Sequence, residues 1–257
     1  STQIYAEYWG YVSGTKKLTS YIAPLSTNYY VLIGSCDKTG GSWTPPPISI
    51  DKIVIRKYVD PEPSIIIDWV PGFKDLYRTP ITITEQSGTD LYNYSIKIIL
   101  NSTNFDGWSN LATANGSDIY FLDSNNNPLY YWIEEFDITN KEANIWVRVP
   151  SIPASSSVTI YMYYGGTNNY PDYNDPSNVF DFRDDFEVWE GWIQYSSGTV
   201  SQSSEQAHRG SYSLKKDDNC DPNGGYKSLG FILDYSFILE AWIIRTYLSG
   251  ANADRIG

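Results

Sequence analysis

The sequence has 257 residues, of which 41% are hydrophobic and 19% charged, and its formal net charge is −12. A chain of this length forms one or two buried cores, and no window approaches the run of apolar residues that a transmembrane helix needs. The acidic excess repels phosphate backbones and anionic membrane surfaces, which argues against nucleic-acid binding and membrane insertion. The chain starts at Ser1 without a basic leader, which predicts a mature product or an excised piece.

The composition predicts an all-β, secreted protein. Aromatic residues make up 16% of the chain, including 23 tyrosines. Tyr, Ile, Thr and Ser fill the patterned segments in place of the Ala, Leu, Glu and Lys that long helices favour. Two cysteines are too few for a disulfide scaffold, and they lack the spacing of a metal or redox motif.

The N-terminal part of the chain predicts strands at 4–9, 17–22, 29–34 and 48–59. Three consecutive prolines at 45–47 lack amide donors and cannot hold a strand ladder. The segment DPEPS at 60–64 is the clearest linker signal, and a further strand is expected at 65–70.

The central part has the cleanest alternation of apolar and polar residues. At 92–100 the even positions are apolar, which predicts a strand with one buried face. The pattern returns at 144–149 and 158–164, and the wide loop between these segments predicts an antiparallel pair. Residues 104–112 are compatible with a short helix.

After residue 184 the composition changes again. Short strands are expected at 208–214 and 227–231. The apolar run at 234–248 is rich in Ile, Tyr and Phe, so we predict a central strand covered on both faces rather than a helix. The last residues do not look like a finished C-terminus.

The central part of the chain contains five motifs: RTPITI at 78–83, SDIYF at 117–121, YWIE at 131–134, IWVRVP at 145–150 and YYG at 163–165. In this order they resemble the family called domain of unknown function 2341, which occurs in archaeal and bacterial surface proteins. The resemblance extends from Leu76 to Phe186. It implies a compact β domain without established chemistry and places the chain in the context of a cell surface.

The flanking segments resemble parts of a concanavalin-type or carbohydrate-binding-module jelly roll. Residues 186–192 and 208–214 resemble the beginning of such a domain, and 49–55 resemble its final strand. Because this order is inverted, the chain is expected to begin and end inside a domain. The resemblance implies a β-sandwich central domain at 76–183, a linker at 68–75, and a lectin-like jelly roll assembled from 1–67 and 184–257.

Three arrangements would explain the split jelly roll. The two halves close on each other within one chain, since the termini of such domains lie close together. Alternatively, each half pairs with a neighbouring copy by β-strand complementation, which builds a head-to-tail filament. In the third arrangement the sequence is one piece of a longer tandem array.

The jelly-roll resemblance also implies a structural Ca²⁺ site. Such modules bind the ion with an acid after the opening Phe, the backbone of a turn and an Asp of the closing strand. The corresponding positions are Glu187, the backbone from His208 to Ser211, and Asp51. Oxygen ligands suit calcium, and the alternative is that these are ordinary surface acids.

We expect no enzymatic activity, because no catalytic constellation emerges. His208 is the only histidine, and it lies in a turn of the jelly-roll resemblance. Glu134 and Glu135 follow Trp132 and would suit a glycosidase, but adjacent residues of a regular strand point to opposite faces. A buried or salt-bridged Glu134 is the favoured interpretation.

Tryptophans and cysteines of the flanks are further candidates. Trp9, Trp43 and Trp192 would stack on sugars if they are exposed. Closure of the jelly roll would bring Cys36 and Cys220 together, so a disulfide and two free thiols are the alternatives.

Asn93, Asn101 and Asn115 lie in glycosylation sequons, in a number that chance alone would produce. The favoured function is a non-catalytic extracellular structural or adhesive module of a cell-surface protein or filament. Its expected partners are copies of itself or neighbouring domains, and glycans. The alternatives are a carbohydrate-binding module of a secreted polysaccharide-active protein and a glycoside hydrolase.

Overall fold

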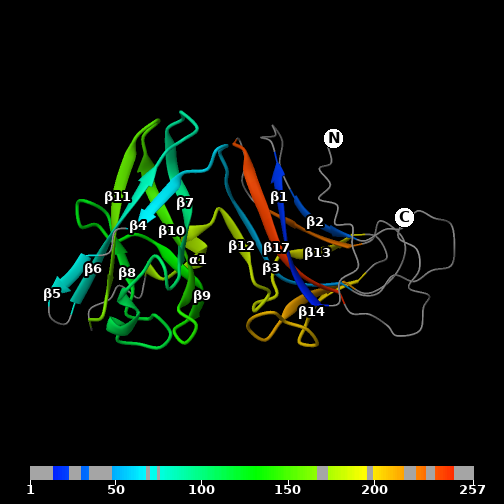
Figure 1. Ribbon diagram of the computed structural model, residues 1–257. Helices are drawn as coiled ribbons and strands as arrows, with labels where there is room; N and C mark the ends of the chain where they lie inside the picture. Colours follow the sequence, from blue (N-terminus) through cyan, green and yellow to red (C-terminus); the bar gives the residue numbers. More distant parts are fainter. Residues whose placement is uncertain are drawn as a thin grey trace. The chain divides into compact units, whose positions relative to one another are not determined.

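Strands dominate the computed structural model, which describes residues 14–22, 30–34, 48–67, 70–73, 76–166, 173–195, 199–216, 224–229 and 235–245 (Figure 1). The expected all-β class is confirmed. Helical structure in the described ranges is limited to short elements such as α1 (Pro176–Val179) and the 3-10 turn η1 (Gly107–Asn110), so the segment 104–112 holds one turn and no longer helix. Within these ranges no helix has the length and apolar character for crossing a membrane.

The chain divides into two compact units. The central unit comprises residues 56–181, and the terminal unit combines the described parts of 1–55 and 182–257. The expected boundaries were 67/68, 75/76 and 183/184. The structure therefore assigns the segment 56–67 to the central unit and not to the N-terminal flank.

The central unit contains eight strands. They are β4 (Ser64–Ile67), β5 (Val70–Phe73), β6 (Leu76–Thr84), β7 (Leu91–Leu100), β8 (Tyr120–Leu122), β9 (Tyr131–Asp137), β10 (Glu142–Ile152) and β11 (Ser157–Tyr164). One sheet has the order β7-β10-β9, and the other has the order β4-β6-β11-β8 with β5 beside β6. Both are antiparallel, and their inner faces share one apolar core.

The predicted pairing of the segments 144–149 and 158–164 is wrong. Strand β10 pairs with β7 and β9, whereas β11 pairs with β6 and β8. Each of these two strands turns its apolar face towards the core between the sheets. Val147 of β10 reaches this core from one sheet, and Met162 of β11 reaches it from the other. The chain therefore crosses between the sheets after β10 and does not turn back as a hairpin.

Alternation explains which residues form this core. Tyr94, Ile96, Ile98 and Leu100 of β7 are buried, as the even-numbered pattern predicts, whereas Tyr92 is 58% exposed and departs from it. The loop after β7 adds Phe105, whose ring meets that of Tyr164 edge to face at 5.1 Å.

Buried carboxylates close the loops of the central unit. Glu85 accepts hydrogen bonds from the amides of Gly88 and Ser155, both at 2.8 Å, and so ties the loop after β6 to the loop before β11. Asp118 accepts from the amide of Gly165 at 2.7 Å, which joins the SDIYF motif to the YYG motif. These acids satisfy loop amides that would otherwise be buried without partners.

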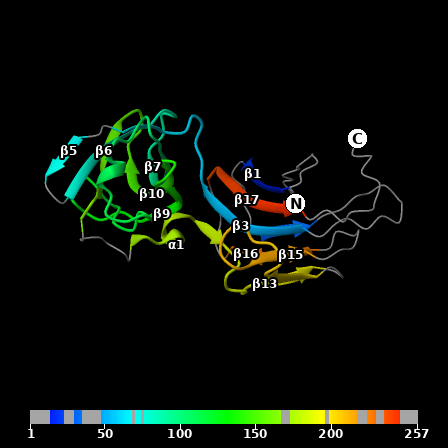
Figure 2. The same cartoon turned by 60° about the horizontal axis from the view of Figure 1, so that its bottom comes forward.

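The terminal unit contains nine strands. They are β1 (Gly14–Ile22), β2 (Tyr30–Gly34), β3 (Ile48–Lys57), β12 (Phe182–Asp184), β13 (Trp192–Tyr195), β14 (Val200–Ser203), β15 (Ser213–Lys216), β16 (Gly224–Ser228) and β17 (Phe237–Arg245). One sheet has the order β1-β17-β3-β15-β14 with β12 also beside β3, and the other has the order β13-β16-β2 (Figure 2).

The two flanks of the sequence pair within one chain. Strand β1 pairs with β17 from Gly14↔Arg245 to Ile22↔Phe237, and β3 pairs with β15 and β12. This arrangement corresponds to the intrachain closure among the three that were considered. Strand β17 lies between β1 and β3, so the strand predicted within 234–248 is an interior one.

The central unit is inserted between two paired strands of the terminal unit. The chain leaves the terminal unit after Ile55 of β3 and re-enters it at Phe182 of β12. These two residues are direct partners in an antiparallel ladder. The two ends of the central unit therefore start from neighbouring positions.

Glu85 should make the stability of the central unit depend on acid. Burial opposes its charge, but hydrogen bonds from Ser87, Ser155 and Gly88 outweigh this effect and lower the pKa to about 2, from the ordinary 4.5. Because the folded pKa is depressed, the stabilisation is complete above pH 4.5 and is lost as the pH falls towards 2.

We therefore predict that Glu85→Gln lowers the melting temperature by several degrees at neutral pH, and that the difference from the wild type shrinks in acid. Thermal unfolding followed by circular dichroism over this pH range measures it. Glu142→Gln, at an exposed position on the same unit, is the control and should change little. A difference between Glu85→Gln and the wild type that stays constant with pH would contradict the prediction.

Candidate functional site

The outer face of the sheet β7-β10-β9 carries a connected network of aromatic and charged side chains. Trp146 of β10 lies at its centre and is 2% exposed. The guanidinium of Arg56 lies 5.0 Å from the centre of its ring, and Nζ of Lys97 lies 5.4 Å from it. The indole N–H of Trp146 and Nζ of Lys97 both donate to Oε2 of Glu134, at 3.0 and 2.9 Å.

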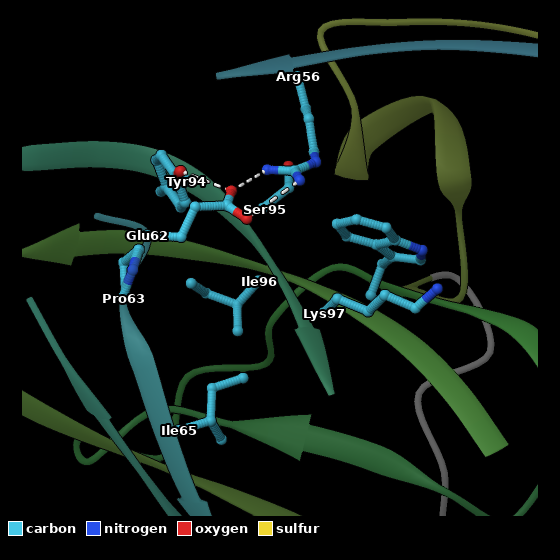
Figure 3. Close-up of a pocket in the computed structure, with 9 residues that line it drawn as sticks. Arg56, Glu62, Pro63, Ile65, Tyr94, Ser95, Ile96 and Lys97 are labelled. Atoms are coloured by element: carbon cyan, nitrogen blue, oxygen red, sulfur yellow. Dashed lines mark hydrogen bonds and ion pairs between the residues drawn. The ribbon is translucent and has the colours of Figure 1, made fainter. Parts of the chain in front are cut away.

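The network continues from Arg56 to the edge of the sandwich (Figure 3). Both terminal nitrogens of Arg56 donate to the carboxylate of Glu62, and the hydroxyl of Tyr94 donates to Oε1 of the same carboxylate at 3.1 Å. Burial of Tyr94 raises the pKa of its hydroxyl, and the charge of Glu62 adds to this effect. The phenol is therefore held as a donor.

These side chains line a cleft of about 80 Å³. Pro63, Ile65, Ser95 and Ile96 complete its wall (Figure 3). Ligand pockets usually span about 300–1,000 Å³. The cleft is thus too small for a sugar ring, and the network around it is best explained as a structural one.

The other end of the central unit is fixed to the same strand. Arg148 lies two residues after Trp146 on β10 and donates to Oδ1 of Asp181 at 3.0 Å and to the carbonyl of Val179 at 3.3 Å. Trp146 and Arg148 therefore anchor the first and last residues of the unit, Arg56 and Asp181. Sequence reasoning missed these anchors, although a Trp at a polar-face position of a half-buried strand was a signal for them.

A β-bulge places Glu134 and Glu135 on one face of β9. Glu135 opposes Asn144 of β10, and the next pair in the ladder skips Glu134. The extra residue shifts the alternation, so Glu134 bonds to Trp146 and Glu135 accepts from Asn144, both on the outer face of β10. The expectation that the two glutamates point to opposite faces assumed a regular strand and is wrong here.

Glu134 is nonetheless buried and salt-bridged, as predicted. Its side chain is 5% exposed and pairs with Lys97. A glycosidase needs one of its two carboxylic acids to donate a proton to the leaving group. Glu134 instead accepts from a lysine and an indole, which does not favour that role.

In the terminal unit, two of the predicted calcium ligands reach one loop. Oδ1 of Asp51 accepts from the amide of His208 at 2.8 Å and from the next amide at 3.2 Å. Oε1 of Glu187 accepts from the amide of Ser211 and from the next amide, both at 2.9 Å. The ring of His208 stacks on Trp242 at 4.1 Å, and the hydrogen bond to Asp51 comes from the backbone amide of this residue.

This arrangement fits a calcium site in part. Burial raises the pKa of Asp51, although the amides of Arg209 and His208 oppose the effect, so a nearby cation would stabilise its charged form. The described residues include no group of three or more His, Cys, Asp and Glu side chains that could hold a metal. Calcium would need the second oxygens of Asp51 and Glu187 together with loop carbonyls, and it stays a prediction.

Trp192 is not placed to stack on a sugar. It is 8% exposed, and its indole N–H donates to Oδ2 of Asp184 at 2.9 Å. Its ring packs against Phe186 in the core, which corrects the expectation of an exposed platform. The other candidates, Trp9 and Trp43, and both cysteines, Cys36 and Cys220, lie outside the described residues.

The three sequons differ in accessibility. Asn93 and Asn115 are exposed. Asn101 is half-buried, and its side-chain oxygen accepts from the amide and the hydroxyl of Thr103 at 2.8 and 2.6 Å. Glycosylation stays a prediction, and the structure favours Asn93 and Asn115 over Asn101.

The hydrogen bond that joins the motifs at 117–121 and 163–165 shows that the resembling segments form one structural unit. Residues 115–202 match the family described as Domain of unknown function (DUF2341). The DUF2341 match confirms the resemblance for the central region. It starts after the RTPITI motif and extends into β14 of the terminal unit. The jelly-roll resemblance of the flanks stays a prediction.

Two relatives are similar to short parts of the chain. Uncharacterized protein MJ1394 of Methanocaldococcus jannaschii is 55% identical over 78 residues, which are 30% of this chain and 8% of that protein. Uncharacterized protein 562 of Sulfolobus islandicus rod-shaped virus 1 is 47% identical over 45 residues, which are 17% of this chain and 8% of that protein. The matched segment of this chain thus covers less than a tenth of the length of each relative. No solved structure matches the chain.

Glu134→Gln tests the network on the outer face. The substitution leaves the ammonium of Lys97 beside a neutral amide, and loss of a charged hydrogen bond of this kind costs about 2 kcal/mol. We predict a decrease of this size in the free energy of unfolding of the central unit, measured by urea denaturation. Glu135→Gln, which keeps an acceptor for Asn144, should cost clearly less. Equal losses in the two variants would argue against the network.

Chelation tests the calcium prediction. If Asp51 and Glu187 bind Ca²⁺ in the native state only, the ion stabilises by mass action, by about 2.7 kcal/mol at a concentration one hundred times its dissociation constant. EDTA should then lower the melting temperature of the wild type but not that of Asp51→Asn or Glu187→Gln. Glu190→Gln is the control and should keep the response. Identical melting of the wild type with and without EDTA would refute the site.

Proposed function

We propose that the chain is a non-catalytic structural module of an extracellular cell-surface protein. The observation that carries this proposal is the use of polar residues within the DUF2341 match. Asp118 closes a loop, and Glu134 and Arg148 fix the outer face of β10. Residues of these types would be available for chemistry in an enzyme, but here they bind other parts of the same fold.

The lengths of the relatives support a modular role. The matched segment makes up 8% of MJ1394 and 8% of protein 562, so sequences like this one occur as short parts of long chains. A long chain built of β units suits an extended structural or adhesive protein. Its net charge of −12 keeps such units apart and in solution.

The proposed partners are neighbouring units of the same long chain. A filament built by strand complementation needs strands that lack partners within the molecule. In the terminal unit, β1 pairs with β17 and β3 pairs with β15 and β12 inside one chain, which favours closure of the two halves within one chain over the filament. The carbohydrate-binding alternative is weakened, because the ring of Trp192 is buried and is not available for stacking on a sugar.

Surface labelling tests the proposal. An antibody raised against the purified chain should label intact cells of the source organism as strongly as permeabilised cells, whereas an antibody against a cytosolic protein should label permeabilised cells only. Labelling that requires permeabilisation would refute the extracellular assignment. Specific retention of the purified chain on a glycan array would favour the carbohydrate-binding module instead.

A further inference from the structure

The described residues of each unit contain a triad of the same type: a lysine, a carboxylate and a tryptophan. In the terminal unit, Nζ of Lys227 and the indole N–H of Trp192 donate to one oxygen, Oδ2 of Asp184, at 2.8 and 2.9 Å. In the central unit, Lys97 and Trp146 share Oε2 of Glu134 in the same way. The Asp184 triad has a further donor, because the amide of Phe186 donates to Oδ1 at 3.0 Å.

The Asp184 triad lies in a largely apolar environment. The side chains of Asp184 and Lys227 are 7% and 19% exposed. The ring of Phe182 lies 5.9 Å from Nζ of Lys227, and Phe186 and Trp192 belong to the core. The pair is therefore largely shielded from solvent.

The amine is also held close to the carboxyl carbon. A nitrogen 2.8 Å from Oδ2 is at most one C–O bond further from that carbon. Since this bond is about 1.2 Å long, the separation is at most about 4 Å, close to the range in which positioned groups react. Lys227 lies opposite Trp192 in the ladder of β13 and β16, which limits its movement.

We propose that Lys227 and Asp184 condense to an intramolecular amide cross-link. A proton moves from the ammonium of Lys227 to Oδ2, and the neutral amine attacks the carboxyl carbon. The negative charge that develops on Oδ1 is stabilised by the amide of Phe186. A second proton moves from nitrogen to Oδ2, the C–Oδ2 bond breaks, and one water molecule leaves. The step needs no oxidant or further reactant.

The bond would join the two sheets of the terminal unit. Asp184 ends β12 beside β3, and Lys227 lies in β16 of the other sheet. The two residues are 43 positions apart, so the link would close a long loop and restrict the unfolded chain as a disulfide does. Unlike a disulfide, it would survive reduction.

Intact mass spectrometry of the denatured and reduced chain tests the proposal. The wild type should be lighter than its sequence by one water molecule, and fragmentation should find the peptide with Lys227 joined to the peptide with Asp184. Lys227→Arg keeps a cation but cannot form this bond, and should have its full mass. Lys97→Arg is the matched control in the other triad and should keep the deficit.

Two results would overturn the cross-link. One is a wild-type chain of full mass after prolonged incubation at the growth temperature of the source organism. The other is a deficit that persists in Lys227→Arg and disappears in Lys97→Arg, which would assign the bond to Glu134. The first result does not depend on the folding of a variant, because it is measured on the wild type.

Discussion

The pairing of Ile55 with Phe182 is the constraint on which both units depend. It holds together the two strands between which the central unit is inserted, β3 and β12. On the side of the central unit, Arg56 and Asp181 are fixed to neighbouring outward positions of β10 through Trp146 and Arg148. The ends of the insertion are therefore held in each unit separately. In the terminal unit the ladder of β3 and β12 holds them, and in the central unit ion pairs and the ring of Trp146 do so.

Carboxylates have a consistent role in this acidic chain. Glu85, Asp118, Asp51 and Glu187 lie on different loops or strands, and each accepts hydrogen bonds from backbone amides of a segment distant in sequence. Loops without regular structure need such acceptors, since a buried amide without a partner is costly. These four acids thus belong to the architecture, and net charge alone gave no indication of this use.

Sequence patterns predicted strands and buried faces better than partners. Alternation identified the buried face of β7, and an apolar run identified the interior strand β17, because these features depend on local composition. It could not show that β10 and β11 lie in opposite sheets, since periodicity gives a face but no neighbour. The bulge at Glu134 was likewise invisible, because it exists only in the register with Asn144. The role of Arg56 was not predicted, because this residue lies close to a linker-like segment. The approach of Asp51 and Glu187 to one loop was expected, but only from a family resemblance.

The adjacency of Ile55 and Phe182 has a consequence for how such chains change over generations. If the 126 residues between these partners were replaced by a two-residue turn, β3 and β12 could form an ordinary hairpin, with their ladder unchanged. A host domain with this property tolerates the gain or loss of a guest through recombination, because neither event alters its hydrogen-bonded register. The same junction could accept other guests whose ends lie equally close together, and modular proteins could diversify in this way while their β framework stays the same.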